Sequence, residues 1–245
     1  MVDQIYTQMR AMQMLTKSQE ITADNLANLN TPGYKGSKVF YQMMNEEMGG
    51  KTVSMSTPKT QIDLTQGVLE STGNPFDLAV DGEGFFSVQQ EGQTLLTRNG
   101  RFYLNDAGTL VDQQGSLVLG EGGPINLSEL MSQELSAAEL NLEVQSDGTL
   151  TINGESKGKL QITTPQSAAD LQRKGAGYFT LEGPSKDAAG ANTRIVQGFY
   201  EKGNVEPLNE MVDMMQTMQL FESQQKAMRT TDEILTKVTG QLGRF

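Results

Sequence analysis

The feature that most constrains the fold is a helical stripe at each extreme end of the 245-residue chain. Residues 2–29 contain no glycine or proline, and their apolar and small residues recur at alternating steps of three and four, which is a heptad pattern. Residues 208–242 repeat the pattern, with Pro207 suited to a first helical turn and Gly240 to a helix end. The sequence therefore predicts two long terminal helices. Their stripes consist of Val2, Ile5, Met9, Met12, Thr16, Gln19, Ala23 and Leu26, and of Met211, Met214, Met218, Phe221, Gln225, Met228, Asp232, Leu235, Thr239 and Leu242.

Both stripes are too polar to hold a helix pair by themselves. Thr16, Gln225 and Asp232 stand where a stable two-stranded coil prefers aliphatic residues, and methionine replaces leucine or isoleucine elsewhere. Two interpretations stay open. The helices pack as ordinary amphipathic elements on a globular core, or they pair with each other and with neighbouring copies, which leaves apolar surface on a monomer.

The middle of the chain has a different pattern, with glycine-containing turns between short apolar runs. Pairs such as Glu91-Gly92, Asn99-Gly100 and Asn153-Gly154 favour tight hairpin turns, and their spacing of roughly eight to twelve residues is typical of an antiparallel sandwich or irregular barrel. Residues 128–136 suggest a short helix or an irregular crossing. Strands are expected at 78–80, 85–88, 95–97, 102–104, 110–111, 116–119, 140–144, 150–152, 160–163, 177–181 and 195–200.

These patterns together predict an α+β fold, in which long N- and C-terminal helices form a coiled-coil-like pair beside a central antiparallel all-β domain. The expected helical domain comprises residues 1–35 and 205–245. Residues 36–75, rich in Ser, Thr, Gln and Lys, are expected to form an extended connector with some strands, and residues 76–204 the β domain.

The composition excludes several classes of function. The chain has no His, Cys or Trp, so imidazole and thiolate catalysis, zinc sites of the finger or hydrolase kind and cysteine-ligated clusters are ruled out. A net charge of −11 repels phosphate backbones, and no stretch approaches the roughly 20 apolar residues of a membrane-spanning helix. The start of the sequence lacks the basic and apolar regions of a cleaved secretory signal. We expect no nucleic-acid partner and no membrane insertion.

Three local motifs resemble ligand sites only superficially. Residues 82–87 lack the third glycine of a nucleotide loop and precede an expected strand. Residues 81–84 and 105–108 do not fit a calcium loop, and they are interpreted as hairpin turns. Neighbouring acids such as Asp77 and Asp81 are expected to be solvated in so acidic a chain. We therefore predict no catalytic, cofactor-binding or metal-binding residue.

The segment from Asp24 to Lys35 is unusual for the end of a helix. Asn25 and Asn28 fall in the expected last turns, where asparagine is a poor helix former unless its amide bonds to other backbone or side-chain groups. Pro32-Gly33 suits the centre of a type II turn, after which the chain continues extended. A polar ladder between packed helices would supply the missing partners.

This segment resembles the N-terminal signature of bacterial flagellar rod and hook proteins. The similarity continues through residues 72–86, 97–111 and 198–205, in the same order as in that family. The length of the chain and the T-G-N-P-x-D-x-A form at residues 72–79 are most like the proximal rod proteins; a distal rod or hook subunit is the alternative within the family.

The resemblance implies a structural subunit and not an enzyme. It implies export through the flagellar type III apparatus without signal cleavage, and polymerisation with its own copies and other rod and hook proteins into a torque-transmitting axle in the periplasmic part of the basal body. A secreted β-rich binding or peptidoglycan-acting module is the alternative of another class. The assembly residues expected are Ile5, Met9, Met12, Asn25, Leu26, Ala27, Asn28, Asn30, Thr31, Pro32, Gly33, Tyr34 and Lys35 near the N-terminus, and Met211, Met214, Met218, Phe221, Gln225, Met228, Leu235 and Leu242 near the C-terminus.

Overall fold

The chain divides into two compact units. The computed structural model describes residues 2–48, 51–128, 142–175, 177–187 and 193–242. The first unit, here called the helical unit, comprises Met1–Ala27, Ser37–Gln61 and Glu206–Phe245. The second, the β unit, comprises Asn28–Gly36 and Ile62–Val205. The chain passes from one unit to the other four times, and the short segment 28–36 belongs to the β unit although helical-unit residues precede and follow it.

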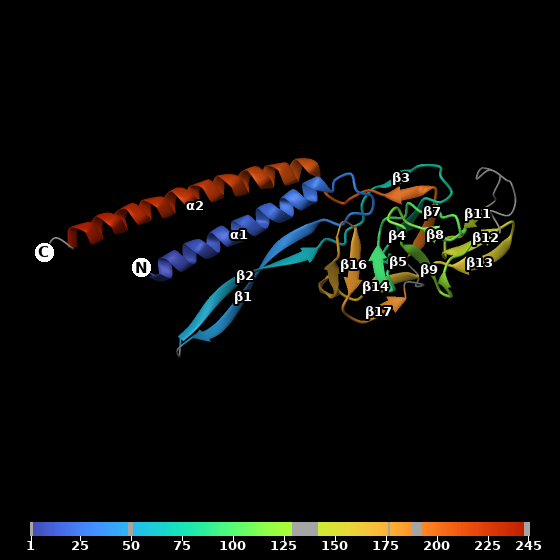
Figure 1. Ribbon diagram of the computed structural model, residues 1–245, viewed down its shortest axis with the longest axis horizontal. Helices are drawn as coiled ribbons and strands as arrows, with labels where there is room; N and C mark the ends of the chain where they lie inside the picture. Colours follow the sequence, from blue (N-terminus) through green and yellow to red (C-terminus); the bar gives the residue numbers. More distant parts are fainter. Residues whose placement is uncertain (1, 49–50, 129–141, 176, 188–192, 243–245) are drawn as a thin grey trace. The chain divides into compact units, whose positions relative to one another are not determined.

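The helical unit contains the two predicted helices and a two-stranded ribbon. Helix α1 (Val2–Ala27) and helix α2 (Pro207–Leu242) run side by side in opposite directions (Figure 1). Pro207 occupies the first position of α2, where its missing N–H costs nothing. Strands β1 (Ser37–Met48) and β2 (Lys51–Ile62) pair with each other, and β1 also contacts α1. Much of the expected connector 36–75 thus forms regular β structure.

The β unit is built from antiparallel strands, as predicted. Its largest sheet has ten strands; the smaller sheets have three or two. Each strand expected from the sequence overlaps an observed one within the described residues. The large sheet follows the order β15 (Leu171–Arg173), β16 (Tyr178–Leu181), β6 (Gln93–Thr97), β5 (Phe85–Gln90), β9 (Leu117–Gly120), β8 (Leu110–Val111) and β7 (Tyr103–Leu104), with β10 (Gly123–Pro124), β14 (Ile162–Pro165) and β17 (Ser185–Asp187) attached beside this path.

Three smaller sheets complete the unit, together with a short 3-10 helix at Ala168–Asp170. One sheet joins strands from neighbouring parts of the chain. The other two join strands more than a hundred residues apart in sequence, so that they close the unit around its core. These sheets are β11 (Leu142–Val144) with β12 (Thr149–Ile152) and β13 (Glu155–Lys159), β4 (Leu78–Asp81) with β18 (Arg194–Gln197), and β3 (Leu69–Ser71) with β19 (Phe199–Glu201).

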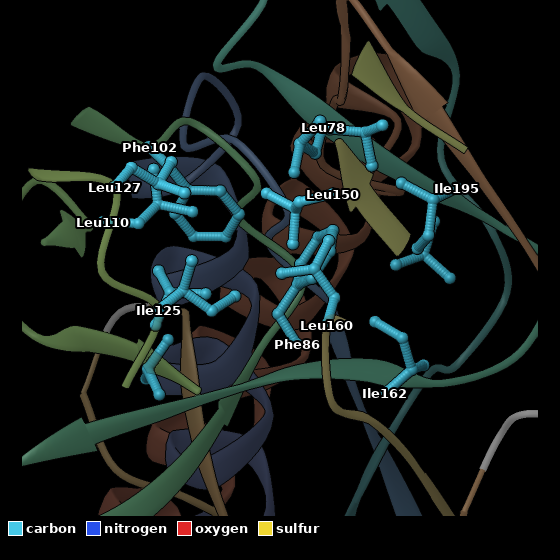
Figure 2. Packing of buried hydrophobic residues seen from close by; sticks show 14 of the residues in the cluster. Leu78, Phe86, Phe102, Leu110, Ile125, Leu127, Leu150, Leu160, Ile162 and Ile195 are labelled. Atoms are coloured by element: carbon cyan, nitrogen blue, oxygen red, sulfur yellow. The ribbon is translucent and has the colours of Figure 1, made fainter. Parts of the chain in front are cut away.

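The hydrophobic core of the β unit is made by the apolar runs of these strands. Phe86 and Phe102 are fully buried and meet edge to face, with ring centroids 5.2 Å apart. Around them lie aliphatic side chains from strands and connecting segments that are far apart in the sequence (Figure 2). The labelled members are Leu78, Leu110, Ile125, Leu127, Leu150, Leu160, Ile162 and Ile195.

Two of the predicted tight turns have the backbone that their residues favour. Glu91 and Gly92 have φ values of 51° and 81°, and Asn153 and Gly154 have values of 51° and 85°, so both central residues are left-handed as a type I′ turn requires. Each pair joins two hydrogen-bonded strands, β5 with β6 and β12 with β13.

Residues 81–84 do not form the expected hairpin turn, because β4 pairs with β18 and not with the following strand β5. The Asn99-Gly100 pair, expected to be another hairpin turn, is not one either. Strand β6 pairs with β5 and β16, whereas β7 pairs with β8. Gly100 is needed for close packing instead, because a Cβ there would lie 1.6 Å from the Leu78 carbonyl oxygen. Of the crossing expected at 128–136, residues 129–136 lie outside the described residues. Among the described residues, neither helix is long and apolar enough to cross a membrane.

Candidate assembly site

One face of α2 packs on α1 and is only partly covered. The covered positions follow a heptad repeat, and Thr217 is the one fully buried residue among the α2 side chains that the structure describes. Over its described side chains, this 36-residue helix therefore buries little of its surface within the chain. The covered positions are Glu210, Met214, Thr217, Phe221, Gln224, Met228 and Thr231.

A second face of α2 is apolar and exposed. Its residues are spaced by three or four positions over the first three turns of the helix, so they form one continuous strip, here called the outer stripe. Their exposed fractions run from 38% at Val212 to 65% at Leu208. Such a strip marks a contact surface more often than an ordinary solvated face. The outer stripe consists of Leu208, Met211, Val212, Met215 and Met218.

The predicted α2 stripe is divided between these two faces. Met214, Phe221 and Met228 face α1, whereas Met211 and Met218 belong to the outer stripe and Gln225 is exposed. The predicted stripe on α1 is divided in the same way. Its Met12, Gln19 and Leu26 are partly covered, and Met9, Thr16 and Ala23 are exposed; the side chains of Ile5, Leu235 and Leu242 lie outside those the structure describes.

Asn25 accounts for the position of the contact face near the start of α2. Its side chain, only 3% exposed, donates to the Ser37 carbonyl at 2.9 Å and accepts from the Ser37 N–H at 2.9 Å. The same amide donates to Glu210 Oε1 at 3.1 Å. Burial raises the pKa of the Glu210 carboxyl, and the bond from Asn25 partly opposes this. Asn25 therefore ties α1, β1 and α2 together.

Asn28 bonds to Thr31 within the loop that follows helix α1. Helix α1 ends at Ala27, so Asn28 lies in the following loop, where its Oδ1 accepts from the Thr31 hydroxyl at 3.2 Å and its carbonyl from the Thr31 N–H at 3.0 Å. The expectation that Asn28 falls in the last helical turns is thus wrong. An asparagine after the last helical turn favours the turn itself, because its side chain bonds to nearby groups.

The Pro32-Gly33 turn is fitted tightly into the β unit. Gly33 has φ of +67°, and its N–H donates to the Glu201 carbonyl at 2.7 Å. A Cβ at this position would lie 2.3 Å from the Arg98 carbonyl carbon. Glycine is therefore required both by the backbone conformation and by the space available.

Lys35 is buried in a charged cluster. Its ammonium group lies 2.7 Å from Glu201 Oε1 and 2.7 Å from the Thr65 carbonyl, and Arg98 Nη1 lies 3.3 Å from Glu201 Oε2. The side chains of Lys35, Arg98 and Glu201 are at most 3% exposed. Desolvation lowers the pKa of Lys35, although Glu201 opposes the shift. Removing Glu201 would leave both buried cations without their shared counter-charge, whereas removing one cation would leave Glu201 paired with the other.

Tyr34 is held by a second cation. The Arg173 guanidinium carbon lies 4.5 Å from the Tyr34 ring centroid and 5.3 Å from that of Phe179. The guanidinium also donates to the Lys35 carbonyl. The aromatic and basic residues of the signature are therefore buried in the β unit, not displayed on the helices. Of the remaining signature residues, Thr31 and Pro32 are partly exposed, and Ala27 and Asn30 are exposed.

Each buried carboxylate among the described residues has at least one partner. Asp112 accepts from the Gln114 and Ser116 N–H groups and from Tyr178 at 2.6 Å; Asp77 accepts from Asn74 at 3.1 Å; Glu201 faces Lys35. In the part of the chain that the structure describes, no group of three or more Asp or Glu is arranged to hold a metal ion. These partners assign the buried acids to the architecture of the β unit.

Sequence reasoning missed the residues that receive the signature. Glu201 and Asn204 stand in segment 198–205 of the resemblance, but no local pattern connects them with Lys35, which is 166 positions from Glu201. Arg98 lies in segment 97–111 of the same resemblance, whereas Arg173 lies in none of its segments, and no local pattern connects either residue with Lys35 or Tyr34. A basic residue within a turn-and-strand segment, without a nearby acid, is the only hint that a distant carboxylate is needed.

Comparison with known proteins gives the same family for both ends and for the middle of the chain. Residues 5–35 match the family described as flagella basal body rod protein, residues 79–172 the flagellar hook protein FlgE/F/G D1 domain, and residues 196–241 the flagellar basal body rod FlgEFG protein C-terminal domain. The resemblance inferred from the sequence is confirmed by all three matches.

Three relatives illustrate the extent of the similarity. The flagellar basal-body rod protein FlgF of Mesorhizobium japonicum is 32% identical over 234 residues, with 94% of each chain covered. FlgF of Salmonella typhimurium is 32% identical over 240 residues, again with 94% of each covered. FlgG of Bacillus subtilis is 27% identical over 267 residues, covering 97% of this chain and 98% of the relative. The chain therefore belongs to the family of flagellar basal-body rod proteins.

Proposed function

We propose that this chain is a structural subunit of the flagellar basal-body rod, and not an enzyme. Its terminal helices form a coiled-coil-like pair and polymerise with other copies and with other rod and hook proteins into a helical axle that transmits torque across the periplasm. The resemblance to proximal rod proteins and the FlgF relatives, covered over 94% of their length, favour the proximal position over a distal rod or hook position. Export through the type III apparatus without a cleaved signal is part of the same proposal.

The observation that carries the proposal is the outer stripe. Burying a Leu, Val or Met side chain is worth about 1.5–3 kcal/mol relative to leaving it in water. Because the five side chains of the strip are about half exposed on average, covering them with a neighbour supplies roughly 4–8 kcal/mol per contact, before the cost of association. A contact of this kind between different faces of successive copies does not close, and it builds a helical filament.

The experiment is a surface variant that leaves the chain's own helix contact intact. Met211, Met215 and Met218 are changed together to Gln, which has a similar shape and helix propensity but is polar. We expect unchanged helix content by circular dichroism, and loss of rods from basal bodies isolated from cells that carry only the variant.

The matched control changes exposed polar residues of the same helix, with Gln216, Gln219 and Ser223 all replaced by Ala. This variant should assemble normally. Normal rods from the methionine variant would contradict the proposal, and so would equal failure of both variants. A rod that forms with the subunit at its distal end, or in the hook, would overturn the proximal position alone.

A further inference from the structure

Three segments of the β unit meet at one place. They are residues 33–36, 63–67 and 201–204. Gly33 N–H donates to the Glu201 carbonyl at 2.7 Å, and Asn204 N–H donates to the Tyr34 carbonyl at 3.2 Å. Asp63 N–H donates to the Gly36 carbonyl at 2.8 Å. Each segment is thus bonded by its main chain to at least one of the others.

Asn204 connects all three segments with its side chain. Its Oδ1 accepts from Gly36 N–H at 2.7 Å, while its amide donates to the carbonyls of Asp63 and Thr65, both at 2.9 Å. The carboxylate of Glu201 acts in parallel, since it binds Lys35 and also accepts from Gly67 N–H at 2.8 Å. These bonds are charge-assisted or use most of an amide's capacity, so they are stronger than average.

The direction of the segments decides how they respond to force. Gly33 is bonded to Glu201 and Tyr34 to Asn204, so residue numbers rise together and the two segments run parallel. Helix α1 precedes the first segment, and α2 begins at Pro207, just after the other. Tension between the helices therefore pulls the two parallel segments in opposite directions. All the hydrogen bonds between the two segments are then loaded at the same time, in shear. Such an arrangement resists more force than one in which the bonds are loaded and broken one after another.

We propose that residues 33–36 and 201–204, joined through Lys35–Glu201 and Asn204, form a mechanical clamp that carries tension from one terminal helix to the other and protects the chain between them. That the clamp serves torque transmission rests on the proposed rod function. The clamp itself is a property of the single chain and is tested on it.

The test is single-molecule force spectroscopy of the full chain, with handles at the two ends. Before rupture, no length should be released from the residues enclosed by the clamp. Its rupture should free the 166-residue separation of Lys35 and Glu201, which corresponds to roughly 550–600 Å of extended chain. Release of enclosed length at lower force, with the clamp still closed, would overturn the proposal.

Asn204→Ala removes the bonds that the Asn204 side chain makes to Gly36, Asp63 and Thr65, and it keeps the Lys35–Glu201 pair and the backbone bonds of the clamp. Its matched control is Gln197→Ala in β18. Like Asn204, Gln197 uses its amide to join separate segments, donating to the Pro75 and Leu142 carbonyls at 2.9 Å and accepting from Val144 N–H at 3.1 Å. We expect the clamp's lifetime at constant force to fall about tenfold in the Asn204 variant, as for one buried polar group left unpaired, and to stay unchanged in the Gln197 variant. Equal shortening in both would overturn the proposal.

A cross-linked variant supplies the length standard even if the Asn204 variant folds poorly. A Cβ built on Gly203 lies 3.6 Å from the Tyr34 Cβ, within the range of a disulfide, and the natural chain has no cysteine. In the oxidised variant Tyr34→Cys/Gly203→Cys, the disulfide prevents the chain between residues 34 and 203 from extending. The total extension of this variant should therefore equal the extension that the wild-type chain reaches just before the clamp ruptures. If the wild-type chain extends further than the oxidised variant before the clamp ruptures, enclosed residues have been released early and the proposal is wrong. Failure of rod assembly with an intact clamp would instead overturn only the proposed function.

Discussion

Gly33 shows how one residue can be demanded by two independent constraints. Its φ of +67° is costly for any residue with a side chain, and the Arg98 main chain occupies the place of a Cβ. Gly73 has nearly the same backbone, with φ of +71°, but nothing lies within 4 Å of its Cβ position. A side chain at Gly73 would therefore cost only backbone strain, whereas a side chain at Gly33 would cost the same strain and also overlap with the Arg98 main chain.

We expect Gly73→Ala to cost about 1 kcal/mol of stability and Gly33→Ala clearly more, about 3 kcal/mol or above, because only the latter must displace backbone. Urea unfolding of both variants, followed by tyrosine fluorescence, measures the difference. Equal losses would mean that the loop 28–36 can move away from Arg98 without cost.

Lys35 gives a dependence on pH whose sign follows from its burial. The folded state lowers its pKa below the ordinary value of 10.5, so in the window between the two values the unfolded chain binds more protons. The free energy of unfolding should therefore gain a contribution that rises with pH through this window. At pH values below this window, Lys35 is protonated in both states, and the folded state bears the full free-energy cost of burying its charge.

Lys35→Arg removes this rise, since arginine stays protonated, and Lys17→Arg at an exposed site is the control. The comparison is made by urea unfolding at pH values below 10.0, because burial and the bond to Asp112 raise the pKa of Tyr178 and stability falls above that tyrosine's ordinary value. A wild-type curve parallel to that of Lys35→Arg would show that Lys35 keeps its ordinary pKa.

At the scale of the elements, local patterns predicted more than distant ones. The turns at 91–92 and 153–154 follow from two adjacent residues each, and both were predicted correctly. The helix face was predicted about one position away from the observed one. The heptad count is nearly satisfied by either face, and the choice depends on the bonds of Asn25 to Ser37 and Glu210, the latter 185 positions away. A pattern that repeats along one helix cannot contain that information.

Asn25→Leu should destabilise the helical unit by about 2–4 kcal/mol, because the Ser37 N–H and carbonyl and the Glu210 carboxyl lose their partner in a buried place. Hydrogen exchange should accelerate in α1 and β1 while the strands of the β unit keep their protection. Gln13→Leu, at an exposed position of α1, is the control. Uniform acceleration over both units would contradict a local role for Asn25.

At the scale of the whole molecule, the two units differ in how much surface they bury. The β unit has a core of fully buried aromatic and aliphatic side chains, whereas α2 buries only Thr217 among its described side chains. The architecture, α+β with terminal helices, could be predicted from the sequence because each element has its own period. The assignment of residues 28–36 to the β unit could not, because it depends on Glu201, Arg98 and Arg173.

We expect two unfolding transitions in the isolated chain, with the helical unit melting first because less apolar surface is removed from water there. Circular dichroism at 222 nm, a wavelength that reports helix, and tyrosine fluorescence, which reports mainly the β unit, should give different midpoints. A single coincident transition would show that the two units fold as one cooperative body.

The meeting of residues 33–36, 63–67 and 201–204 has a consequence for how such a chain can change over generations. The two ends of the segment from Val68 to Tyr200 lie next to each other, because Gly67 and Glu201, which flank it, are joined by a hydrogen bond. Glu201 is in turn bonded to Gly33. Insertions, deletions or replacement of the segment from Val68 to Tyr200 are therefore compatible with unchanged helices α1 and α2, as long as the spacing between the ends of the segment is kept. In a chain of this kind, the terminal helices and the three joined segments are constant, and the body between residues 68 and 200 is the part that can vary.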